Sequence, residues 1–213
     1  MGMLTARLEL IAEKARTTLS SKDAARERAL QSSRDALRHS TDAIRSVHRG
    51  EYEEAKKRLA SARDLLKELD EMLSEHQELL HRGFVYSAQK EYVEGCVTLG
   101  LIADNTLPGP DELGVDYAAY LNGLGEAVGE LRRHILDITR KGEIARCEEL
   151  LETMDDIYGV LVTMDFPDAM TGGLRRTTDA VRGILERTRG DLTIAFRQRE
   201  LEEKLAAFEK KLT

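Results

Sequence analysis

Two pairs of glutamates could form a divalent-metal site in this chain of 213 residues. Glu91 and Glu94 lie in the unusually apolar stretch 84–103, and Glu126 and Glu130 lie in a stretch that contains several glycines. Residues three or four positions apart share one face of an α-helix. Carboxylates held close together repel one another and take up protons unless a cation compensates their charge. Mg²⁺, or Mn²⁺ in its place, prefers oxygen ligands and can activate water for attack on a phosphate ester.

Spacing alone does not identify such a site, because the chain contains 39 acidic residues. Three other pairs have the same spacing and are interpreted as surface charges: Glu68/Glu71, Glu149/Glu152 and Glu200/Glu203. The pair Glu91/Glu94 differs in having apolar residues on both sides. The pair Glu126/Glu130 differs in having few other charges before Arg132. Context therefore favours these four glutamates as metal ligands and catalytic residues.

Other catalytic classes have weaker support. A ferritin-like di-iron site needs Glu-x-x-His pairs on two helices, and none of the four glutamates is followed by a histidine at that spacing; His134 lies four residues after Glu130. The chain has no Gly-x-Ser-x-Gly motif and no Walker-type glycine loop, and neither Cys96 nor Cys147 has a histidine in an obvious motif.

Basic residues close to the glutamates in sequence are candidates for contact with a nucleic-acid backbone. They are Arg82, Lys90, Arg132 and Arg133. For each of them, an ordinary solvent-exposed charge is the alternative. The net charge of −7 argues mildly against a nucleic-acid partner, but bound cations would offset the carboxylates locally.

The elements that must position these residues are helices. Apolar residues recur in steps of three and four over residues 3–18, 24–49, 51–73, 84–104, 116–140, 143–164 and 174–196. We expect a break at residues 20–23, a hairpin at Gly50, loops at 107–111 and 166–168, and an interruption near Gly190. Glycines 123, 125 and 129 in one helix predict that another backbone or a ligand approaches it closely. The sequence shows no pattern of a β-strand.

Length and composition predict one domain over residues 1–213. The first residues lack the apolar core of a signal peptide, and no apolar run approaches the roughly 20 residues that span a bilayer. Two isolated cysteines are typical of reduced thiols. These features predict a cytoplasmic protein with no membrane partner.

Three segments resemble the translin family, and within it the branch of translin-associated factor X. They are residues 43–51, residues 89–94, and residues 116–133 with the run Gly-Glu-Leu-Arg-Arg at 129–133. The resemblance extends from about residue 26 to residue 196. It implies an all-α, antiparallel bundle of about seven helices that assembles into an octameric shell around RNA or single-stranded DNA.

The resemblance also implies an activity, an endoribonuclease that depends on Mg²⁺. Glu91, Glu94 and Glu130 match catalytic positions of the factor X branch, and Glu126 stands where that branch has aspartate. Arg133 matches a basic position shared across the family and therefore ranks above Arg132. Because the chain carries the acidic set itself, we expect a homo-oligomer. The alternatives are a shell that binds RNA or DNA without cleaving it, and a purely structural helical protein.

Overall fold

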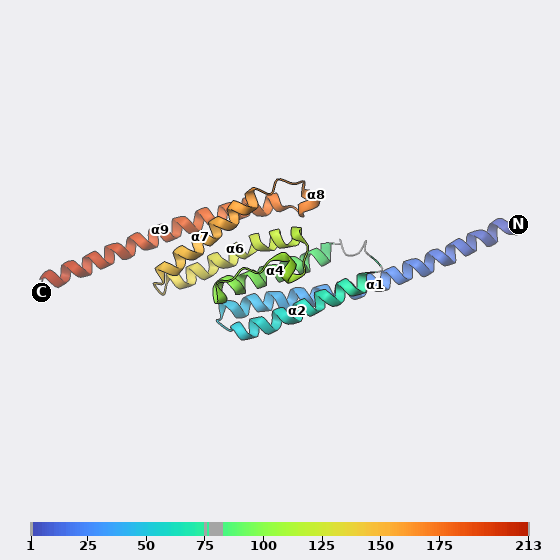
Figure 1. Ribbon diagram of the computed structural model, residues 1–213, viewed down its shortest axis with the longest axis horizontal. Helices are drawn as coiled ribbons and strands as arrows, with labels where there is room; N and C mark the ends of the chain where they lie inside the picture. The colour runs from blue at the N-terminus through green and yellow to red at the C-terminus, as the bar shows by residue number, and fades with distance from the viewer. Residues whose placement is uncertain (1, 75, 77–82, 213) are drawn as a thin grey trace.

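The computed structural model describes residues 2–74, 76 and 83–212, and every regular element in them is helical (Figure 1). The predicted all-α class is confirmed. The elements are α1 (Met3–His48), α2 (Tyr52–Leu73), α4 (Gly83–Leu99), the π-helix η1 (Gly100–Asp104), α5 (Pro110–Leu113), α6 (Tyr117–Thr139), α7 (Ile144–Val162), α8 (Asp168–Thr171) and α9 (Leu174–Leu212). No helix of the described residues is long and apolar enough to cross a bilayer.

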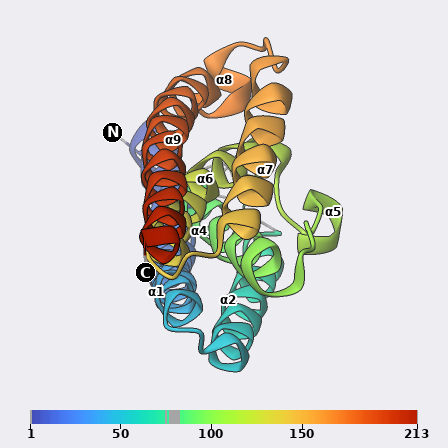
Figure 2. The ribbon, with the colours of Figure 1, turned by 90° about the vertical axis from the view of Figure 1, so that its left-hand side faces the viewer.

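Helices α4 and α6 form the middle of the bundle. Figure 2 shows them between the α1–α2 hairpin and the pair α7 and α9. Their facing apolar residues are fully buried in the main core, as the sequence periodicity predicts: Val93, Val97, Ala127, Val128 and Leu131. The four glutamates on these two helices are accordingly partly buried at the boundary of the core.

The predicted α1–α2 hairpin is confirmed. Helix α1 ends at His48, and Gly50 adopts the left-handed conformation with φ +75°. A residue with a side chain is strained in that conformation, which is why a glycine ends the helix here. The two helices then run antiparallel along one another (Figure 1).

Two predicted interruptions are wrong. Helix α1 continues through residues 20–23, because Ser, Lys and Asp disfavour a helix interior only slightly and no Pro or Gly is present there. Helix α9 continues past Gly190. A single glycine costs about 1 kcal/mol in a helix, and burial of the flanking Thr188 and Leu192 offsets it.

Helix 84–104 ends differently from the expectation. Its last turn is the π-helix η1, followed by Asn105 with φ 52°. The Thr106 backbone N–H donates to the Gly100 carbonyl at 2.9 Å. A Cβ atom added at Gly100 would lie 2.5 Å from the Thr106 carbonyl oxygen, so the returning loop requires glycine at this position.

Candidate metal and nucleic-acid site

The four predicted ligands lie together where α4 and α6 face one another. The helices approach closely because Gly123 has no side chain: a Cβ atom there would lie 2.6 Å from the Lys90 carbonyl oxygen. Gly125 makes room for α9 in the same way, since its Cβ would lie 2.5 Å from Thr177 Cγ2. The predicted close approach of another backbone is confirmed at Gly123, whereas Gly125 accommodates side chains. At Gly129 a Cβ would have its nearest neighbour at 4.0 Å, so no other helix backbone approaches it closely.

Glu94 is the central carboxylate of the cluster. Partial burial, and after it the negative charges of Glu91, Glu126 and Glu130, raise its pKa to about 8 against a smaller opposing effect of Lys90. Among the described residues, no side chain donates a hydrogen bond or forms an ion pair with Glu94. Its ionised form is therefore destabilised by both desolvation and repulsion, which are the conditions that a bound cation relieves.

Two of the other carboxylates have partners from neighbouring elements. Thr41 of α1 donates a hydrogen bond to Glu91 Oε1 at 2.6 Å. Lys90 Nζ lies 2.6 Å from Glu126 Oε1, and both side chains are partly buried. Lys90 is one turn from Glu94 on the same helix, so its ammonium group supplies positive charge at the edge of the cluster.

Glu130 is held by a histidine that the sequence analysis did not select. Glu130 Oε2 accepts a hydrogen bond from His48 Nε2, and this bond, with the charges of His48 and Arg133, lowers the pKa of Glu130. The His48 side chain is 4% exposed, and its Nδ1 atom has no hydrogen-bond partner in the described part of the chain. His48 lies in the last turn of α1, and no spacing in the sequence links it to residue 130.

The donor set suits a hard divalent cation, since it offers carboxylate oxygens from two facing helices. As the side chains lie, no group of three His, Cys, Asp or Glu residues within the described ranges is placed to hold a metal ion. Three of the four carboxylates are occupied by Thr41, Lys90 and His48. The residues therefore fit a metal by their chemistry, and binding requires Lys90 to release Glu126.

A groove of roughly 620 Å³ leads to the cluster from the side of α9. Its polar lining includes Glu94, Glu126, Lys90 and Arg176. Arg176 is exposed and forms no side-chain ion pair with any residue that the structure describes. The sequence analysis missed it, because it follows Glu94 by many residues and belongs to a different helix.

The four basic residues predicted to contact nucleic acid differ in their position relative to the glutamates. Lys90 borders the cluster, and Arg133, whose side chain is 56% exposed, lies 3.7 Å from Glu130. Arg132 instead turns to α9, where it donates to Thr188 at 3.0 Å and to Asp191 at 2.7 Å. Arg82 lies outside the described residues, as do Glu78 and His81, which have the Glu-x-x-His spacing.

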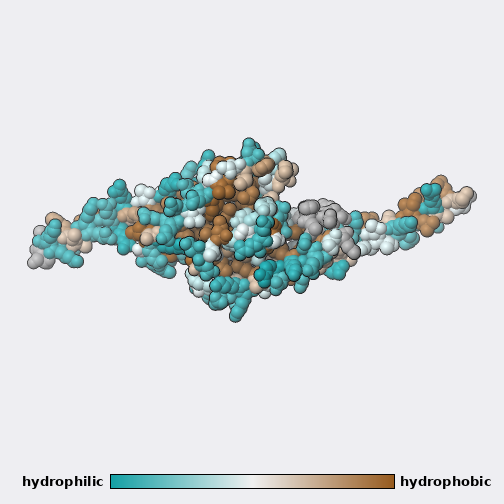
Figure 3. Space-filling view, viewed as in Figure 1, coloured by the Kyte–Doolittle hydropathy of each residue, from teal (hydrophilic) through white to brown (hydrophobic). Residues whose placement is uncertain are grey.

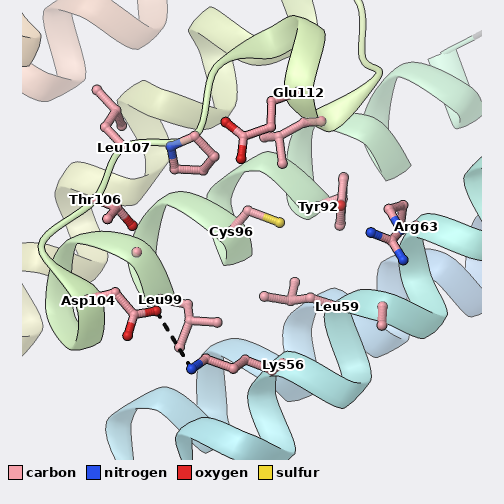
Figure 4. Close-up of a pocket in the computed structure, with 14 residues that line it drawn as sticks. Lys56, Leu59, Arg63, Tyr92, Cys96, Leu99, Asp104, Thr106, Leu107 and Glu112 are labelled. Atoms are coloured by element: carbon pink, nitrogen blue, oxygen red, sulfur yellow. Dashed lines mark ion pairs between the residues drawn. The ribbon is translucent and has the colours of Figure 1, made fainter.

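A second hollow, between α2 and the loop after α4, contains none of the four glutamates (Figure 4). Tyr92 and Cys96 point into it, and Lys56 pairs with Asp104 at 3.8 Å across its edge. Burial raises the pKa of the Cys96 thiol to about 12, so the thiol stays protonated and is a poor nucleophile.

Comparison with known proteins identifies the family. No family model matches the chain. The uncharacterized protein MJ0175 of Methanocaldococcus jannaschii is 32% identical over 189 residues, which are 88% of this chain and 83% of that protein. The crystal structure of AfC3PO is 35% identical with a TM-score of 0.82 and matches 88% of this chain and 98% of its own. The AfC3PO–duplex RNA complex is 36% identical with a TM-score of 0.79 and matches 88% of this chain and 97% of its own.

Apo-NeC3PO, at 24% identity and a TM-score of 0.72 over 88% of this chain and 96% of its own, supports the fold alone. The C3PO structures are of the translin type, and the two AfC3PO structures match nearly their whole length at more than a third of positions. The helical architecture agrees with the one that residues 43–51, 89–94 and 116–133 predict. The chain belongs to the translin family.

Proposed function

We propose that this protein is a metal-dependent endoribonuclease, of the kind found in the factor X branch of the family. The observation that carries the proposal is Glu94, a partly buried carboxylate that has no partner among the described residues and lies near three more carboxylates. Leaving a charge in this position costs stability unless it serves a ligand. A structural role is better served by an apolar residue there.

Glu91, Glu94, Glu126 and Glu130 would hold one or two Mg²⁺ ions, with Mn²⁺ as a substitute. A cation bound there supplies an activated water and compensates charge on the scissile phosphate. The chain's own residues set the geometry: Thr41 orients Glu91, and His48 holds Glu130 in its ionised form. Both partners come from α1, so the hairpin and the central helices act together.

RNA is the proposed substrate because AfC3PO, which this chain resembles, has been solved in complex with duplex RNA. Arg133, near Glu130, and Arg176, in the groove with Glu94 and Glu126, are exposed cations that would contact the phosphate backbone. Lys90 would join them once it leaves Glu126. Contacts to phosphates carry no base information, so cleavage should depend little on sequence. We propose a homo-oligomeric shell, octameric as in the family, that encloses the RNA.

The test is cleavage of a labelled RNA with Mg²⁺ by the wild type, Glu94→Ala and Glu94→Gln, with Glu152→Gln as the control. Glu152 is an exposed acid whose spacing to Glu149 equals that of Glu94 to Glu91. We expect both Glu94 variants to lose at least about a hundredfold in rate, as when a group that stabilises the transition state is removed. EDTA should abolish wild-type cleavage. Equal rates for wild type and Glu94→Ala, with contaminating nuclease excluded, would remove Glu94 from the mechanism.

A second candidate is a shell that binds RNA or single-stranded DNA without cleaving it. It is favoured by the partners that already occupy Glu91, Glu126 and Glu130. In that case the wild type binds nucleic acid with strong salt dependence, and Mg²⁺ produces no cleavage.

A further inference from the structure

Helix α1 supplies a supporting face for two of the four glutamates. Thr41 and His48 are seven residues apart, so they lie two turns apart on the same side of the helix. Thr41 Oγ1 donates a hydrogen bond to Glu91 Oε1 on α4 at 2.6 Å. His48 Nε2 donates to Glu130 Oε2 on α6, since an ionised carboxylate only accepts. One helix thus holds one proposed ligand from each of the two central helices.

The two donors belong to the part of α1 that is anchored in the bundle. Residues 3–24 extend from the body of the molecule as a single exposed helix (Figure 3), whereas Thr41 and His48 lie where α1 packs against α2 and α4. Ala43 and Val47, on the same stretch of helix, are buried in the main core. Packing therefore fixes the positions of both donors relative to the glutamates.

Each donor occupies one oxygen of its carboxylate and leaves the second oxygen open. Glu91 Oε2 and Glu130 Oε1 accept no hydrogen bond from any residue that the structure describes. Arg133 lies 3.7 Å from Glu130 Oε2, the oxygen that His48 already contacts, so it leaves Oε1 open as well. A cation can therefore bind each carboxylate through its open oxygen while Thr41 and His48 keep their hydrogen bonds.

Lys90 affects Glu126 in a different way. Its ammonium group lies 2.6 Å from Glu126 Oε1 and carries a charge that repels a cation. Its flexible four-carbon stem allows it to move aside, whereas a threonine hydroxyl and a buried imidazole on a packed helix stay in place. Thr41 and His48 are therefore supports for a metal site, and Lys90 is a competitor of the metal.

We propose that Thr41 and His48 are positioning residues that keep Glu91 and Glu130 as one-oxygen ligands, and that they thereby favour Mg²⁺ or Mn²⁺ over Ca²⁺. The inference rests on the metal site of the proposed function. It adds two residues outside the four glutamates that decide which divalent cation the site prefers.

The preference follows from the ligands that the cations need. Mg²⁺ takes about six oxygens in near-octahedral geometry and keeps several waters, and Mn²⁺ accepts the same arrangement. Ca²⁺ is larger, takes about six to eight oxygens, and often binds a carboxylate through both of them. A fixed donor holds one oxygen of Glu91 or Glu130 in place and prevents the rotation that brings both oxygens to one cation. Glu94 has no such donor among the described residues, so it is equally available to either cation.

Calorimetric titration of the full-length protein with Mn²⁺ and with Ca²⁺ tests the inference, because it measures binding rather than cleavage. Thr41→Val removes the hydroxyl and keeps the shape of the side chain, and His48→Leu removes the ring donor. Each should weaken Mn²⁺ binding roughly tenfold, as the loss of a hydrogen bond to a metal ligand does. Ca²⁺ binding should change little, since Ca²⁺ gains the freed oxygen. The ratio of the Ca²⁺ to the Mn²⁺ dissociation constant should therefore fall roughly tenfold.

Conservative variants separate the hydrogen bonds from the packing of the side chains. Thr41→Ser and His48→Gln keep a donor and should retain the wild-type ratio. Thr153→Val is the matched control, because the Thr153 hydroxyl on α7 donates to the Glu149 carbonyl of its own helix at 2.9 Å. Circular dichroism and urea unfolding check that each variant folds, and Thr41→Val alone decides if His48→Leu does not fold.

The possible failures are distinguishable. A wild-type ratio in Thr41→Val and His48→Leu would overturn this inference and leave the proposed metal site intact. A ratio that falls as far in Thr41→Ser as in Thr41→Val would assign the effect to packing, and would also overturn it. Absence of Mn²⁺ binding by the wild type would overturn the metal site itself, and this inference with it.

Discussion

The pairs Glu91/Glu94 on α4 and Glu149/Glu152 on α7 have the same spacing but opposite surroundings. Glu149 and Glu152 are exposed, and Glu149 pairs with Arg146 on its own helix at 2.9 Å. Glu94 is partly buried, lacks a partner among the described residues, and is repelled by three further carboxylates. The helix spacing only places two acids on one face. The facing helix α6 and the apolar core decide whether that face is solvated or forms a site.

The largest consequence of this difference should be the effect of pH on stability. The pKa of Glu94 is raised to about 8 in the folded protein, whereas an unfolded glutamate titrates near pH 4.3, roughly. Between these values the folded protein holds a proton that the unfolded chain has lost. The resulting stability is fully present below about pH 4 and is lost as the pH rises toward 8, by about 1.4 kcal/mol per pH unit.

Glu94→Gln should remove this slope and, without metal, unfold at higher urea concentration than the wild type at pH 8. The expected gain is about 2–4 kcal/mol. Urea unfolding in EDTA between pH 5 and pH 8 measures it, and Glu152→Gln is the control that should follow the wild type. A pH profile of Glu94→Gln that runs parallel to the wild type would show that the pKa of Glu94 is not raised in the folded protein.

The ion pair beside the cluster offers a second contrast. Lys90–Glu126 and Lys204–Glu200 have the same separation of 2.6 Å, but the second pair lies on the outer part of α9. Lys90→Met should cost roughly 1–2 kcal/mol, because it leaves Glu126 without its partner next to other carboxylates. It should also strengthen Mn²⁺ binding roughly tenfold, since one positive charge near the cation is lost.

Calorimetric titration with Mn²⁺ and urea unfolding check the two effects. Lys204→Met serves as the matched control and should change neither. Mn²⁺ affinity that is identical in Lys90→Met and the wild type would mean that Lys90 does not compete with the metal for Glu126.

The sequence predicted the helices wherever a residue type prevents a helix from continuing. Gly50, Pro108 and Pro167 lie between helices as expected, whereas Pro110 begins the short helix α5 within the loop expected at 107–111. The break expected at residues 20–23 and the one at Gly190 are wrong, because weak helix formers and a lone glycine lower helix stability without stopping it. The π-helix at Gly100 was missed, since it depends on the following loop folding back so that Thr106 contacts Gly100.

The site was predictable in part, for a related reason. Apolar context distinguished Glu91 and Glu94 from the same-spaced surface pairs, which are exposed as expected. Thr41, His48 and Arg176 were missed, because they reach the cluster from α1 and α9 and have no fixed spacing to the glutamates. The local sequence pattern thus identifies residues whose burial is set by their own helix. It does not identify their partners, which tertiary packing brings from other helices.

The smallest expected effect separates two adjacent arginines. Arg133 is exposed beside Glu130, whereas Arg132 is held by Thr188 and Asp191. Arg133→Ala should weaken RNA binding and reduce by about 1 the slope of log affinity against log salt. Arg132→Ala should leave that slope unchanged and instead cost about 1 kcal/mol in unfolding free energy, since it loses two hydrogen bonds between α6 and α9.

Fluorescence anisotropy with labelled RNA at several salt concentrations, together with urea unfolding, distinguishes the two arginines. Equal slopes for Arg133→Ala and Arg132→Ala would mean that exposure beside the glutamates does not decide which arginine contacts RNA. The RNA path would then have to follow Arg176 and the α9 groove, whose lining includes Glu94 and Glu126.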